Sequence, residues 1–91
     1  MRVDKFLKVS RLIKRREVAK QLCDAGLVWC NGKEAKPSTE VLPGDMLRLI
    51  LGRHTLTVRV LQPLPHATKE SAATMYEIVK DKIENRGNDN A

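Results

Sequence analysis

The dipeptide Asn31-Gly32 constrains the fold of this chain more than any other feature of its sequence. Both residues tolerate a positive φ, so this pair is the strongest short signal for a two-residue β-hairpin turn. Residues 27–30 alternate before it in the manner of a strand, and residues 33–36 can return the chain. The pair therefore predicts an antiparallel hairpin one third of the way along the sequence.

Apolar residues recur at helical spacing in the segment before this hairpin. The spacing predicts a first helix at 4–9, where Asp4 stands in the first turn and favours the helix dipole. A second helix is expected at 15–25 and should end at Gly26, since glycine readily adopts the left-handed conformation that terminates helices. We expect this second helix to bury one face, formed by Val18, Ala19, Leu22 and Cys23.

Strand patterns follow the hairpin. The apolar run at 46–51 predicts a buried strand, and 55–61 alternates cleanly, with Leu56, Val58 and Val60 expected inward. Apolar positions return to helical spacing at 69–84, which predicts a C-terminal helix. The expected fold is α+β, with two short N-terminal helices packed on a small antiparallel sheet and a C-terminal helix.

Positive charge is concentrated at the amino end. The first twenty residues hold eight basic and two acidic side chains, and this excess equals the net charge of +6 of the whole chain. Charge placed so unevenly implies a polyanionic partner for this segment. The alternative is a solvated basic face that only keeps the protein soluble.

Three basic residues crowd the start of the second expected helix, namely Lys14, Arg15 and Arg16. Unpaired backbone N–H groups already make a helix start partly positive, so these cations oppose the helix dipole. A phosphate would offset that cost, because it accepts bonds from the backbone donors and pairs with guanidinium groups. The pattern favours contact with a nucleic-acid backbone.

The sequence resembles the RNA-binding domain family named after ribosomal protein S-four over about residues 2–61. The resemblance rests on ordered motifs, which are Arg2-x-Asp4-Lys5-Phe6-Leu7, Ser10-Arg11, Arg15-Arg16, Ala19, Leu22, Gly26-x-Val28, Asn31-Gly32, Ala35-Lys36 and Val41-x-Pro43-Gly44-Asp45. It implies that two helices pack on a small sheet and present a basic surface to structured RNA. We accordingly divide the chain into an S-four-type domain at 1–62, a helical extension at 63–85 and a disordered tail at 86–91.

The compact length and the segment 72–76 are most similar to one bacterial branch of that family, which acts in ribosome-associated quality control and is related to a small ribosome-binding heat-shock protein. This likeness implies binding to large-subunit rRNA and to peptidyl-tRNA on split large ribosomal subunits. It also implies a tail-adding partner, RqcH, which extends stalled chains with alanine. We expect a cytoplasmic monomer without membrane association.

Carried over position by position, the family's RNA-facing positions fall on Arg2, Lys5, Ser10, Arg11, Arg15 and Arg16, and the patch is extended here by Lys8, Lys14 and Lys20. Asp4 has two possible roles, to orient an arginine such as Arg16 or to cap the first helix. Trp29 could stack on a flipped base or pack against the C-terminal helix or a loop. Asn31 is expected to serve the turn, with RNA contact as a second role, and Lys33 is a further secondary candidate.

Other classes of function find less support in the sequence. No Gly-rich cofactor loop, metal cluster or nucleophile–base pair appears, so we expect no cofactor, metal or catalysis. An accessory domain of an RNA-modifying enzyme is the main alternative, and a DNA-binding helix-turn-helix regulator is another. His54 and His66 receive no role, and Cys23 and Cys30 are expected to be reduced and buried.

Overall fold

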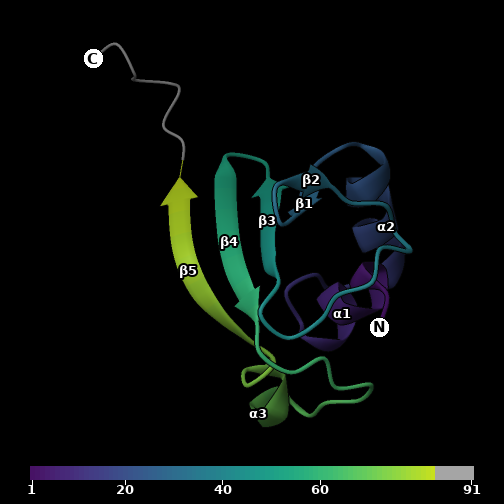
Figure 1. The fold of residues 1–91 in the computed structure, drawn as a ribbon, viewed down its shortest axis with the longest axis vertical. Coiled ribbons are helices and arrows are strands. Elements are labelled where there is room, and N and C mark those ends of the chain that lie inside the picture. Colours follow the sequence, from purple (N-terminus) through teal and green to yellow (C-terminus); the bar gives the residue numbers. More distant parts are fainter. Residues whose placement is uncertain (84–91) are drawn as a thin grey trace.

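Two helices cover one end of a five-stranded antiparallel sheet in the computed structural model, which describes residues 1–83 (Figure 1). The strand order is β2-β1-β3-β4-β5, and β5 forms the edge away from the helices. This confirms the expected α+β class and its antiparallel sheet. The elements are α1 Val3–Val9, α2 Arg16–Asp24, β1 Val28–Cys30, β2 Lys33–Glu34, β3 Met46–Leu51, β4 His54–Val60, α3 Lys69–Ala72 and β5 Tyr76–Ile83.

The hairpin between β1 and β2 forms where the sequence predicts it. Asn31 and Gly32 have φ angles of 51° and 83°, and Cys30 faces Lys33 across the turn. The Asn31 side chain also ties the turn to β3, because its Oδ1 accepts a bond from the Met46 N–H at 2.9 Å and its Nδ2 donates to Asp45 at 3.1 Å. Both polar atoms of the Asn31 side-chain amide are therefore hydrogen-bonded within the protein.

The core lies between the helices and the sheet. Leu56, Val58 and Val60 face inward as predicted, with exposed fractions of 8%, 0% and 0%. From the helical side, α1 supplies Phe6 and Leu7, which are fully buried. Burial of such side chains is the main favourable term in folding, so this contact fixes α1 against the sheet.

Both N-terminal helices begin and end within one residue of their predicted bounds. Gly26 has a φ of 76° just past α2, and its N–H bonds to the Cys23 carbonyl at 3.0 Å, which confirms its role as a terminator. On α2, Ala19 and Cys23 are buried, whereas Val18 is 38% exposed and its predicted burial is wrong. Within residues 1–83, no helix has the length and hydropathy of a membrane span.

The C-terminal helix predicted at 69–84 is wrong. Of the described part of this range, 69–83, only α3 is helical, with Thr68 capping it by accepting a bond from the Ser71 N–H at 3.2 Å. The chain then pairs with β4 as β5, from Tyr76 opposite Val60 to Ile83 opposite His54. The predicted tail at 86–91 lies outside the described residues, and the domain boundary at 62 stays a prediction.

The strand forms because β4 would otherwise leave one edge without backbone partners, and pairing with β5 satisfies those groups. A register shift between Thr57 and Val58 leaves Val79 outside the ladder, which breaks strict alternation in β5. Ile78, Val79 and Ile83 are exposed, so the apolar spacing that predicted a helix does not mark a buried face.

Two leucine-to-alanine substitutions compare a buried position in the sheet with an exposed position outside it. Leu49→Ala should lower the free energy of unfolding by about 2–5 kcal/mol, because Leu49 is fully buried in β3 and its loss leaves a cavity. Leu42→Ala should change it by less than about 0.5 kcal/mol, because Leu42 is 56% exposed. Urea denaturation followed by circular dichroism checks both values, and equal losses would contradict the observed packing.

Candidate nucleic-acid interface

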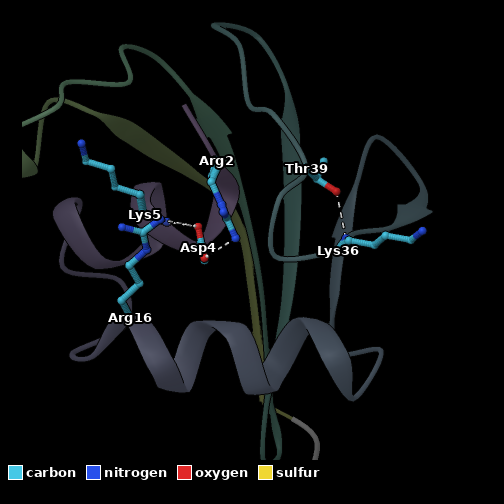
Figure 2. Close-up of polar contacts among 6 residues, drawn as sticks. All are labelled: Arg2, Asp4, Lys5, Arg16, Lys36 and Thr39. Carbon is cyan, nitrogen blue, oxygen red and sulfur yellow. Dashed lines mark hydrogen bonds and ion pairs between the residues drawn. The ribbon is translucent and has the colours of Figure 1, made fainter.

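A buried carboxylate, that of Asp4, organises the amino-terminal cations. Its side chain is fully buried and accepts bonds from Arg2 at 3.2 Å, from Arg16 at 3.3 Å and from the Lys5 backbone N–H at 2.7 Å (Figure 2). A buried charge is tolerated only where it is paired and hydrogen-bonded, and these three donors meet that condition. Asp4 thus joins the start of α1 to the start of α2.

Of the two roles considered for Asp4, the contacts favour the orienting one, because no side-chain cap bond is present at the start of α1. The carboxylate orients Arg16 across twelve residues of sequence, and it accepts a bond from an N–H in the first turn of α1. Asp4 is not the N-cap residue itself, since that position is held by Arg2, which makes no side-chain cap. One side chain performs the orienting and the first-turn bonding together.

The loop after β2 holds Arg2 in place. Arg2 forms an antiparallel bridge with Glu40, the Val3 N–H donates to the Thr39 carbonyl at 2.7 Å, and the Val41 N–H donates to the Met1 carbonyl at 2.9 Å. The loop itself is closed by the Lys36 N–H, which donates to Thr39 Oγ1 at 2.8 Å (Figure 2). Chain segments far apart in sequence therefore fix the backbone from which Arg2 projects.

The two arginines remain accessible while they hold the carboxylate. Their side chains are 49% exposed for Arg2 and 42% exposed for Arg16, and each guanidinium carries five N–H donors. Apart from Arg16 Nε, which is buried, donors not used on Asp4 can therefore bond an outside acceptor. Because a guanidinium matches the geometry of phosphate oxygens, an oriented pair is a preformed phosphate site.

The remaining cations continue from this pair. Arg2, Lys5, Lys8 and Arg11 follow at intervals of three along α1 and the turn after it, and Arg16 and Lys20 are one turn apart on α2. Lys5 and Lys8 within α1, and Arg16 and Lys20 within α2, are neighbours on a helix surface, whereas Arg2 and Arg11 flank α1 at its two ends. We call this set the basic surface, and it comprises Arg2, Lys5, Lys8, Arg11, Lys14, Arg15, Arg16 and Lys20.

Most of the basic surface is not neutralised from within. Among residues 1–83, only Arg2 and Arg16 of this set form an ion pair, and both share Asp4. Arg15 is the N-cap of α2 and makes no side-chain cap bond, so the cations lie beside a helix start that no N-cap side chain covers. The positive charge that the sequence concentrates at the amino end is therefore exposed to solvent.

Ser10, which the sequence placed among the RNA-facing residues, is only 2% exposed. Its hydroxyl donates to the Leu7 carbonyl at 3.3 Å and accepts from the Leu12 N–H at 3.5 Å. Expecting a direct contact here was wrong, because the hydroxyl closes the end of α1. Ser10 supports the turn that carries Arg11.

The hairpin candidates lie apart from the basic surface. Trp29 is on the sheet face opposite its buried neighbours Val28 and Cys30, and the Arg48 guanidinium carbon lies 5.0 Å from its ring centroid. Trp29 therefore packs on β3, and its packing against a C-terminal helix is wrong. Lys33 is exposed on the edge strand β2.

Lys36 is a cation that the predicted site left out. It lines a hollow of about 460 Å³ together with Arg2, between the start of α1 and the loop after β2. The motif Ala35-Lys36 was its signal in the sequence. The same hollow is lined by Asp24 and Glu34, so its charge is mixed.

Both cysteines are free and buried, as predicted. Burial, together with the nearby carboxylates of Asp4 and Asp24, raises the pKa of the Cys23 thiol to about 11. Burial also raises the pKa of the Cys30 thiol, with Asp45 contributing. Both thiols therefore stay protonated at neutral pH and act as small apolar residues.

Replacing the Asp4 carboxylate tests whether RNA affinity depends on how the cations are arranged or only on the total positive charge. Asp4→Asn keeps an oxygen acceptor for Lys5 but removes the charge that holds Arg2 and Arg16. We expect the free energy of unfolding to fall by about 1–3 kcal/mol. Affinity for a structured RNA should also fall, although the substitution makes the chain more positive. Fluorescence anisotropy checks the affinity.

Asp24→Asn is the matched control, because it adds the same charge at an exposed position at the end of α2. It should leave RNA affinity unchanged or slightly raised. Tighter binding by Asp4→Asn would show that net charge alone decides affinity and that Asp4 does not organise the site.

Comparison with known proteins places these observations in a family. An S4 domain model matches residues 1–47. The chain is 50% identical over 82 residues to the "RQC P-site tRNA stabilizing factor" of Bacillus subtilis, spanning 90% of this chain and 95% of that protein. Its identity to the protein of the same name from Streptococcus pneumoniae is 47% over 81 residues, spanning 89% and 92%.

A solved structure, described as trimeric, of Vibrio cholerae heat shock protein 15 shares 29% identity and a TM-score of 0.81 with this chain, over 87% of this chain and 81% of that one. Its similarity extends the match beyond the helices and across the sheet. The chain therefore belongs to the S4 domain family and, within it, to the family of the RQC P-site tRNA stabilizing factors.

Proposed function

We propose that this chain is a non-catalytic RNA-binding factor of ribosome-associated quality control. Its basic surface would bind large-subunit rRNA and peptidyl-tRNA on a split large ribosomal subunit, and it would thereby assist an RqcH-type factor in adding alanine to a stalled chain. The observation that carries this proposal is the oriented Arg2–Asp4–Arg16 cluster within a basic surface whose other cations form no ion pair among residues 1–83.

The chemistry of the surface supports RNA as the ligand. Cations at helix spacing, beside a helix start, suit the regularly spaced phosphates of a folded nucleic acid. The family relatives support the cellular setting, since the printed name of the Bacillus subtilis relative refers to P-site tRNA. The expectations of a monomer and of a cytoplasmic location stay predictions.

Binding without catalysis fits the groups on this surface. The hydroxyl of the predicted site, Ser10, is buried and bonded to backbone atoms. Among residues 1–83, no three His, Cys, Asp or Glu side chains gather where they could hold a metal ion. We therefore assign the exposed cations to holding RNA and give them no role in a reaction.

A double substitution on α2 tests the proposal. Arg15→Ala with Lys20→Ala removes two exposed cations that make no ion pair within residues 1–83, so the fold should be unaffected. Affinity for isolated large ribosomal subunits should fall about tenfold or more, measured by co-sedimentation. The slope of log affinity against log salt should become shallower by roughly 2, because two phosphate contacts are lost.

The matched control is Arg53→Ala with Lys82→Ala, which removes the same residue types and the same charge. These residues lie in the turn between β3 and β4 and near the end of β5, away from both helices (Figure 1). The control should bind as the unaltered protein does. Equal weakening by both double variants would mean that total charge, rather than the basic surface, governs binding.

The same pair of variants tests the proposed role in tailing. Large subunits carrying peptidyl-tRNA, supplied with an RqcH-type factor and alanyl-tRNA, should form longer alanine tails when the unaltered chain or the control is added. The Arg15/Lys20 variant should not lengthen them. Unchanged tails with the unaltered protein, despite intact binding, would limit the proposal to RNA binding alone.

A further inference from the structure

A second hollow, of about 670 Å³, lies between the turn after α1 and the connection from β4 to α3. Lys8, Arg11 and Lys14 line one side, and His66 lines the other. In Figure 1 the connection from β4 to α3 swings out beneath α1, which brings together segments more than fifty residues apart. The His66 side lies outside the 1–47 match, so the hollow joins the S4 domain to the segment that follows the sheet.

The charged side of the hollow suits a phosphate group. Three cations meet there, and none of the described residues that line it is acidic. Arg11 has a φ of 65°, a conformation that costs free energy for a residue other than glycine. Its N–H bonds to the Lys8 carbonyl at 3.0 Å, so the turn holds two of the cations side by side.

The other surfaces of the hollow suit a flat aromatic group. Ile13, only 6% exposed, and Val9 supply apolar surface from the helical side. Pro65 and Ala67 flank His66 and add apolar surface opposite. The volume lies within the usual range for sites that hold small organic molecules, about 300–1,000 Å³. Imidazole rings commonly stack on unpaired bases in RNA-binding proteins.

We infer that this hollow binds one unpaired nucleotide of an RNA, with its base against His66 and its phosphate on Lys8, Arg11 and Lys14. The inference rests on the proposed function and extends it, because the basic surface alone would recognise only the backbone. A nucleotide pocket lets the protein favour RNA that presents an unpaired base. A free nucleotide offers the same chemistry, so the test separates the two sources.

The test uses two hairpin RNAs that differ by a single bulged adenosine, together with the full chain and two variants. The chain has two histidines. His54 is the matched control because it pairs with Asp81 of β5 and does not line the hollow. His66→Ala should weaken binding of the bulged hairpin about fivefold or more and leave the fully paired hairpin unchanged. His54→Ala should change neither.

Nuclear magnetic resonance of the two imidazole rings supplies the second readout. The bulged hairpin should shift the His66 resonances and leave those of His54 in place. Equal effects of His66→Ala on both hairpins, or none on either, would overturn the pocket. Adenosine 5′-monophosphate that shifts His66 when the bulged hairpin does not would assign the hollow to a free nucleotide and overturn its place in RNA binding.

The outcomes also distinguish this inference from the proposed function. Salt-sensitive binding of both hairpins with equal affinity would leave the basic surface intact and remove only the pocket. Failure of the unaltered protein to bind either hairpin or large ribosomal subunits would remove both.

Discussion

The carboxylate of Asp4 is the interaction on which this structure most depends. It is fully buried, and it is satisfied only because Arg2, Arg16 and the Lys5 N–H all reach it. A charge taken out of water is costly unless such donors surround it, so the carboxylate enforces the position of each. The contact that joins the two helices also fixes where the guanidinium groups of Arg2 and Arg16 lie on the surface.

This arrangement links folding to binding. The sheet provides a rigid support, the loop after β2 fixes the amino terminus against it, and α1 packs on it through Phe6 and Leu7. The backbone beneath the basic surface, and the side chains of Arg2 and Arg16, therefore need little ordering when they meet RNA, and less ordering means a smaller entropic cost of binding. β5 extends the sheet at the edge away from α1 and α2. The connection from β4 to α3, which precedes β5, brings His66 next to the turn after α1.

Local chemistry was sufficient to predict much of the fold and part of the site. Asn31 and Gly32 specify their turn by backbone preference alone, and the alternation at 56–60 specifies which side is buried. The segment 76–83 was misjudged because its apolar residues follow helical spacing but remain exposed in β5, so the open edge of β4 rather than a buried face decides its structure. Lys36 and His66 line hollows shared with distant segments, which spacing along the chain does not reveal. Ser10 was misjudged for a local reason, because its hydroxyl bonds the backbone of Leu7 and Leu12.

If the cations organised by Asp4 are the RNA-binding face, their side chains should respond directly when RNA is added. The most direct measurement follows the arginine side-chain resonances while large-subunit rRNA fragments are titrated into the full chain. Shifts are expected for Arg2, Arg11 and Arg16, and none for Arg48 or Arg59 on the sheet. Shifts confined to the sheet arginines, with Arg2 and Arg16 unchanged, would contradict it.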